Sequence, residues 1–122
     1  MATNEMTVQE FRKAQAKTER ERLETELLFQ MRAAQLPEPE RQFRFGPRWI
    51  VDFGFPPEQV LIEVQGGSWI GGRHTRGPGY ADDCRRLHRA QMLGWHMIFV
   101  TGDMIQSGEA LQMIEEALRN GA

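Results

Sequence analysis

The sequence predicts an α/β protein, a small mixed β-sheet flanked by helices. Two stretches rich in Val, Ile, Phe and Trp, Arg48–Phe55 and Val60–Gly67, are separated by Pro56–Gln59, a pattern typical of neighbouring strands joined by a short turn. Apolar residues at helical spacing occur both before and after them. The predicted order is helix, three strands, helix, strand, helix. With 122 residues, this order fits one domain with a modest core.

The first helix is predicted from Thr7 to about Gln35. Capping-box spacings begin at Thr7 and again at Thr18, so the sequence leaves open a break near Thr18. The apolar stripe lies in the second half and comprises Leu23, Leu27, Leu28 and Met31. Because the first half is mostly polar, we expect residues 1–17 to form a helical arm that docks on a partner subunit or on its own domain. Residues 18–122 would form the main domain.

The remaining elements follow from alternation, turn residues and helical spacing. They are the strands Arg41–Phe45, Arg48–Phe55, Val60–Gly67 and Trp95–Val100, and the helices Tyr80–Leu93 and Ser107–Arg119. In the helix after the third strand, we expect Cys84, Leu87 and Gln91 on one face. The segment 66–79 is a glycine-rich loop of fourteen residues. A loop of this length inside a small domain is usually functional.

Charge and cysteine content narrow the function classes. The net charge is -2, so no global basic field indicates nucleic acid, but residues 41–91 hold eight Arg against five Asp or Glu, a balance of +3. Arg binds phosphate or carboxylate through two nitrogens, although these residues can also pair with local acids. The single cysteine, Cys84, cannot form an internal disulfide. With no membrane-length apolar run and no signal-peptide core, we expect a cytoplasmic protein.

Two carboxylates interrupt the apolar strands, Asp52 in the first and Glu63 in the second. A charge inside a buried strand is costly unless something compensates it, and a shared divalent cation bound by oxygens would do so. Solvent exposure or pairing with an Arg are the alternatives. Glu24, beside the apolar stripe of the first helix, converges on the same edge. The Val64 carbonyl, between Glu63 and Gln65, can complete an oxygen shell that suits Mg²⁺ or Mn²⁺.

The spacing Asp-x(10)-Glu-x-Gln across two strands resembles the PD-(D/E)XK nuclease superfamily. Within it, the chain is most similar to small phage and bacterial endonucleases akin to very-short-patch-repair enzymes. The stretches that carry the resemblance are Leu36-Pro-Glu-Pro-Glu-Arg, Arg48-Trp-Ile-Val-Asp-Phe, Glu63-Val-Gln-Gly-Gly, Gly72-Arg-His-Thr-Arg-Gly, Asp83-Cys-Arg-Arg and Gly94-Trp95. The resemblance runs from about Glu24 to Asp103. It implies a restriction-endonuclease-like core and makes residues 18–122 a nuclease-like domain.

The resemblance also implies roles for individual residues. Asp52 and Glu63 would hold the metal, and Glu24 would contact it directly or through water. His74 would carry a proton or donate to a phosphate, unless it is an ordinary loop histidine. Arg73, Arg76 and Arg86 would bind phosphates, and Asp83 would orient Arg86 or His74. Superfamily members commonly carry Lys, and near relatives Glu, where this chain has Gln65, which can position a water but cannot take a proton.

The expected function is a Mg²⁺- or Mn²⁺-dependent DNA endonuclease that hydrolyses phosphodiester bonds. It would cut branched DNA such as a Holliday junction, or nick, in DNA repair or recombination of a bacterium or a phage-infected host cell. A homodimer would suit cutting of two strands. The alternatives are a catalytically weakened nucleic-acid-binding module of the same fold and an RNase. A zinc site at Cys84, His88 and His74 has little support, because the chain has one Cys and no CxxC motif.

Overall fold

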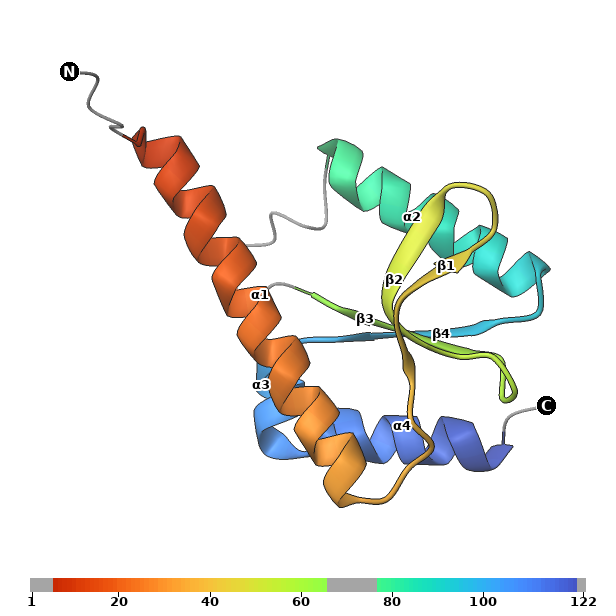
Figure 1. Cartoon of the computed structure of the whole chain (residues 1–122). Coiled ribbons are helices and arrows are strands. Elements are labelled where there is room, and N and C mark those ends of the chain that lie inside the picture. The colour runs from red at the N-terminus through yellow and green to blue at the C-terminus, as the bar shows by residue number, and fades with distance from the viewer. Residues whose placement is uncertain (1–5, 66–76, 121–122) are drawn as a thin grey trace.

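The computed structural model describes residues 6–65 and 77–120, which form a four-stranded sheet with helices on both faces (Figure 1). The elements in chain order are α1 (Val8–Ala33), β1 (Glu40–Phe45), β2 (Trp49–Phe55), β3 (Val60–Val64), α2 (Gly77–Met92), β4 (His96–Val100), α3 (Gly102–Ser107) and α4 (Glu109–Asn120). The predicted fold class and element order are therefore confirmed. The one addition is the short helix α3.

The sheet is mixed and has the strand order β1-β2-β3-β4. β1, β2 and β3 are antiparallel neighbours joined by short turns, whereas β3 and β4 are parallel. A parallel pair needs a crossover connection, and α2 lies within it. In Figure 1, the β1–β2 hairpin rises steeply across the direction of β3 and β4, which is the twist expected of a short sheet.

Two apolar clusters hold the helices to the sheet. On one face, α1, α3 and α4 pack on alternate strand residues through a cluster that includes Leu27, Phe53, Ile62 and Ile114. On the other face, α2 packs through Ala90 and its neighbours on a second cluster. Because β3 is covered on both sides, four of its five residues are buried, and Glu63 is the exception. Glu63 is therefore an ionisable residue on a strand whose other residues are all buried.

α1 is a single helix of 26 residues, so the break near Thr18 does not occur. The Thr18 hydroxyl donates to the Ala14 carbonyl inside the helix at 2.9 Å instead of capping a new one. A capping box does form at the start, between Thr7 and Glu10. All five buried residues of α1 lie at Leu23 or beyond, and the first turns project away from the sheet (Figure 1). The division of the chain at residue 17 stays a prediction.

One local prediction was wrong. The last helix was expected to begin at Ser107, but Thr101 caps α3 and Gly108, with φ of 88°, separates it from α4. In α2, Cys84 and Gln91 are exposed, whereas Arg86 and Ala90 are buried. The side of α2 that packs on the sheet therefore includes a charged residue. Within the described ranges, no helix is both long and apolar enough to cross a membrane.

Candidate active site

Asp52 and Glu63 face each other where β2 and β3 begin to separate. The regular register between these strands ends at Phe53 opposite Ile62. At the next position, side chains take over the bonding. The Asp52 backbone N–H donates to Glu63 Oε1 at 3.3 Å, and the Val64 N–H donates to Asp52 Oδ2 at 2.7 Å. Both carboxylates are thus fixed to the backbone of the opposite strand, at an opening in the ladder.

β2 changes its facing at Asp52. In a regular strand, residues two apart share a face, yet Val51 belongs to the cluster beneath α2 and Phe53 to the cluster beneath α1. The strand therefore twists sharply at Asp52. As a result, Asp52, which is only 8% exposed, reaches the side of the sheet that α1 covers, while Glu63 reaches α2.

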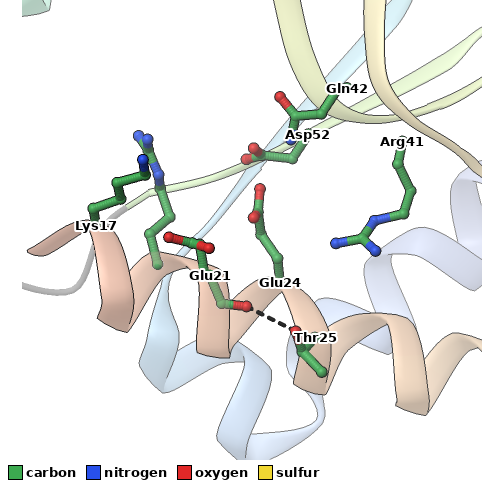
Figure 2. Close-up of a pocket in the computed structure, with 8 residues that line it drawn as sticks. Lys17, Glu21, Glu24, Thr25, Arg41, Gln42 and Asp52 are labelled. Atoms are coloured by element: carbon green, nitrogen blue, oxygen red, sulfur yellow. Dashed lines mark hydrogen bonds between the residues drawn. The ribbon is translucent and has the colours of Figure 1, made fainter.

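Glu24 of α1 meets Asp52 from the helix side. Its side chain is 6% exposed, and Figure 2 shows the two carboxyl groups pointing toward each other. Burial raises the pKa of Glu24 to about 8, helped by a hydrogen bond with Asp52 and by its negative charge. Arg20 and Arg41 oppose this rise in pKa. Without a bound cation, Glu24 therefore holds a proton near neutral pH.

Glu63 has a cationic partner. Arg86 Nη1 donates to Glu63 Oε2 at 3.4 Å and to Asp83 Oδ1 at 3.2 Å, and Arg86 Nη2 donates to the Ile50 carbonyl at 3.4 Å. Burial and the charge of Asp52 raise the pKa of Glu63 to about 7, while Arg86 lowers it. Arg86 is itself buried, and its Nε has no hydrogen-bond partner among the described residues.

A pocket of about 340 Å³ opens between α1 and the β1–β2 hairpin, with Asp52 and Glu24 on its wall (Figure 2). We call it the α1 pocket; it is lined by Lys17, Arg20, Glu21, Glu24, Thr25, Arg41, Gln42 and Asp52. Three of these residues are basic and three acidic. A pocket that holds buried carboxylates and carries Lys and Arg can admit an anionic group such as a phosphate beside a cation.

Sequence reasoning missed Lys17, Arg20 and Arg41 as site residues. Lys17 and Arg20 precede Glu24 by seven and four positions, which places them on the same helix face. That spacing was available in the sequence. Arg41 lies near the start of β1, and only the pairing of β1 with β2 brings it near Asp52.

The structure brings Glu24 to Asp52 on the α1 side and brings Arg86 and Asp83 to Glu63 on the α2 side, but not all predicted site residues can be placed. The side chain of Gln65 is half-buried, and its backbone N–H donates to the Val100 carbonyl at 2.7 Å. Three predicted residues lie outside the described ranges: Arg73, His74 and Arg76.

The carboxylates suit Mg²⁺ or Mn²⁺ chemically, since all are hard oxygen donors. Their present arrangement is not that of a formed metal centre. Among residues 6–65 and 77–120, no three His, Cys, Asp or Glu side chains are grouped as a ligand set. The contacts explain this: Glu63 is drawn toward Arg86, and Asp52 toward Glu24 and the Val64 N–H. The Arg86 contact with Glu63, at 3.4 Å, and the Asp52 N–H contact, at 3.3 Å, are both long, so Glu63 is held weakly.

Comparison with known proteins supports the fold. No protein-family model matches the sequence, and no curated protein is detectably similar to it. Among solved structures, the chain is similar to the catalytic domain of the homing endonuclease I-Bth0305I. The TM-score is 0.64 at 16% sequence identity, and the match covers 80% of this chain and 94% of that domain. At this identity the likeness concerns the arrangement of helices and strands alone.

Proposed function

We propose that this chain is a metal-dependent DNA endonuclease that hydrolyses phosphodiester bonds. The observation that carries the proposal is the pair Asp52 and Glu63, set opposite each other where the β2–β3 ladder opens. The similarity of the fold to a homing endonuclease catalytic domain supports it. Membership of the PD-(D/E)XK superfamily and a likeness to very-short-patch-repair enzymes remain part of the proposal.

Asp52, Glu63 and the Val64 carbonyl would hold Mg²⁺ or Mn²⁺, and Glu24 would bind directly or through water. Asp52 lies between Glu24, which meets it on the α1 side, and Glu63, which lies opposite it on β3. Burial, helped by the negative charge of Asp52, raises the pKa values of both glutamates. A divalent cation beside Asp52 would offset that negative charge. When bound, it would supply Lewis-acid polarisation of the phosphate and a more acidic water.

The other polar residues would act on the substrate. Lys17, Arg20 and Arg41 line the α1 pocket and would hold the phosphates on either side of the scissile bond. Gln65 would position the attacking water, as its amide can accept and donate hydrogen bonds. His74 would donate a proton to the leaving oxygen, with Arg73 and Arg76 on flanking phosphates.

Arg86 and Asp83 would serve as positioning residues. Arg86 is buried and contacts Glu63 and Asp83, so it would set the orientation of Glu63 before a cation binds. This differs from a phosphate-binding role for Arg86, which would require the guanidinium to leave Glu63. Both roles use the positive charge of Arg86, and in both the position of Glu63 depends on whether Arg86 stays bound to it.

The finer parts of the proposal concern the substrate and setting. We propose branched or nicked DNA in bacterial or phage repair and recombination as the substrate, which this domain would read through DNA shape and backbone contacts. The projecting half of α1 would build a homodimer for cutting two strands. The protein would act in the cytoplasm of a bacterium or an infected host.

The test combines cleavage with binding. Purified protein is incubated with Mg²⁺ or Mn²⁺ and plasmid, forked or four-way DNA, alongside Asp52→Asn, Glu63→Gln and the control Glu116→Gln on the exposed face of α4. We expect wild type and control to cut, and the two site variants to bind DNA without cutting. Binding without cutting by wild type under either metal would favour the nucleic-acid-binding module. Cutting of RNA alone would favour the RNase.

A further inference from the structure

A second pocket lies between exposed residues of α2 and Trp49 at the start of β2. We call it the α2 pocket; it has a volume of about 400 Å³ and is lined by Trp49, Cys84, Arg85, His88 and Arg89. The four α2 residues are exposed, and Trp49 at the start of β2 is half-buried. None of them contributes to the carboxylate site described above.

The charge of the α2 pocket is of one sign. Its lining contains two Arg and one His and no acidic residue, whereas the α1 pocket contains equal numbers of acids and bases. Within the described part of the chain, Arg85 and Arg89 form no ion pair. Arg85 and Arg89 are four positions apart, so their side chains emerge on one face of the helix, one turn from each other. Two exposed cations spaced in this way can bind an anion with regularly spaced negative charges, such as the phosphates of a nucleic acid.

Trp49 forms one wall of the α2 pocket, and its neighbours hold the ring in place. Its ring stacks on Phe45 at 6.0 Å between centroids, and Arg48 lies over it at 5.7 Å. Trp49 also packs with the apolar cluster beneath α2. The exposed Arg48 therefore adds a further positive charge at the rim, held by a cation–π contact. Arg beside an aromatic ring is a combination suited to the nucleic-acid backbone.

We infer that the α2 pocket binds the phosphate backbone of duplex DNA beside the segment held at Asp52. The inference rests on the proposed function for its substrate class, but uses none of the catalytic residues. Trp49 is three residues before Asp52 on β2, so the α2 pocket and the carboxylates lie on neighbouring parts of one strand. Contacts with the phosphate backbone at the α2 pocket would increase DNA affinity independently of sequence.

The chain contains its own probe for this contact. Cys84 is its single cysteine, is exposed and lines the α2 pocket. In EDTA, where metal-dependent cutting is blocked, the rate of Cys84 modification by a coloured thiol reagent is measured with and without a short DNA duplex. We expect bound duplex to slow modification several-fold, and added salt to restore the rate as the duplex dissociates.

A double substitution that removes two positive charges tests whether the α2 pocket contacts the phosphates. In Arg85→Ala/Arg89→Ala, duplex affinity at 0.1 M salt should fall roughly 10- to 100-fold, and the slope of log affinity against log salt should shrink by about 2. The matched control Arg22→Ala/Arg119→Ala removes the same charge from exposed positions on α1 and α4 and should retain both values. Circular dichroism checks that both variants are folded.

The outcomes separate this inference from the proposed function. Unchanged affinity and slope in Arg85→Ala/Arg89→Ala, or full Cys84 reactivity at saturating duplex, would overturn the inference even if the wild type cuts DNA. Protection of Cys84 in a wild type that cuts nothing with Mg²⁺ or Mn²⁺ would leave this inference standing and overturn the proposed function. Failure of wild type to bind duplex at all would overturn both.

Discussion

Asp52 and Glu63 face each other across one opening in the sheet, but their surroundings differ. On the Asp52 side, the nearest ionisable group is another buried acid, Glu24, and the pair is balanced by a proton. On the Glu63 side, the buried cation Arg86 forms an ion pair with Glu63 and a second ion pair with Asp83. The comparison teaches that a protein can bury neighbouring carboxylates by protonation on one side and by ion pairing on the other.

This difference has a consequence for metal binding. A cation entering between Asp52 and Glu63 would displace a proton from Glu24 and weaken the hold of Arg86 on Glu63. Cation binding would stabilise the Asp52 side most, because the proton on Glu24, which offsets the negative charge there, is lost as the pH rises.

The largest effect on stability is expected at Arg86. Arg86→Met keeps much of the side-chain volume but leaves Glu63 and Asp83 without their cation, and removing one partner of a buried pair costs about 3–5 kcal/mol. Urea unfolding of wild type and Arg86→Met measures the loss. The double variant Arg86→Met/Glu63→Gln should recover part of it. A loss below about 1 kcal/mol would mean that Arg86 does not balance the Glu63 side.

The pH dependence of stability should be the next largest effect. The pKa values of Glu24 and Glu63, about 8 and 7, lie above the ordinary 4.5, so the folded protein holds protons that the unfolded chain releases. This stabilisation is complete below about pH 4.5 and is lost as the pH rises through 7 and 8. We expect Tm to fall between about pH 6 and pH 9 without metal, and to fall less with Mg²⁺.

Scanning calorimetry across that range, with and without Mg²⁺, measures both curves. The titration of other groups is controlled by repeating the series in Glu24→Gln/Glu63→Gln, whose Tm should vary less. If the double variant loses as much stability as wild type between the two pH values, the two glutamates do not carry the raised pKa values.

Glu24 itself should give a smaller effect with the opposite sign from Arg86. Glu24→Gln removes a group that repels Asp52 when ionised, so metal-free stability at about pH 9 should rise by about 1 kcal/mol. Mn²⁺ affinity should fall about 10- to 100-fold, since an oxygen donor near the cation is weakened. Urea unfolding and calorimetric Mn²⁺ titration measure the two quantities. Lower stability together with unchanged Mn²⁺ affinity would contradict the role assigned to Glu24.

The smallest effect on stability is expected at Lys17. Its side chain lies at the rim of the α1 pocket and is exposed, so Lys17→Met should change the unfolding free energy by less than about 0.5 kcal/mol. DNA affinity should nevertheless fall about tenfold with the loss of one phosphate contact. Lys13→Met, one turn earlier, is the matched control. Equal effects from both lysines would mean that the charge of the helix matters and the pocket does not.

The strands and their acids could be predicted because the signals were local. Val, Ile and Phe around Asp52 and Glu63, with Pro56 in the turn between them, fix two antiparallel strands, and register then sets the acids opposite each other. The apolar stripe from Leu23 to Met31 likewise identified the buried half of α1.

Other features depend on tertiary contacts that no local pattern contains. The change of face at Asp52 occurs where the pairing of β2 with β3 stops, while its pairing with β1 continues along the strand. Arg86 is buried with ion-pair partners, Glu63 and Asp83, beneath α2, and helical spacing alone does not predict such partners. Arg41 joins the site through strand pairing rather than proximity in sequence.

The central claim, that Asp52 and Glu63 jointly bind a divalent cation, is tested most directly by a crystal structure of the protein soaked in Mn²⁺. We predict an anomalous peak about 2.0–2.5 Å from one carboxylate oxygen of each residue, with Arg86 displaced from Glu63. Crystals of Asp52→Asn should lack the peak. A wild-type structure that keeps Glu63 on Arg86, with Mn²⁺ bound elsewhere or not at all, would contradict the account.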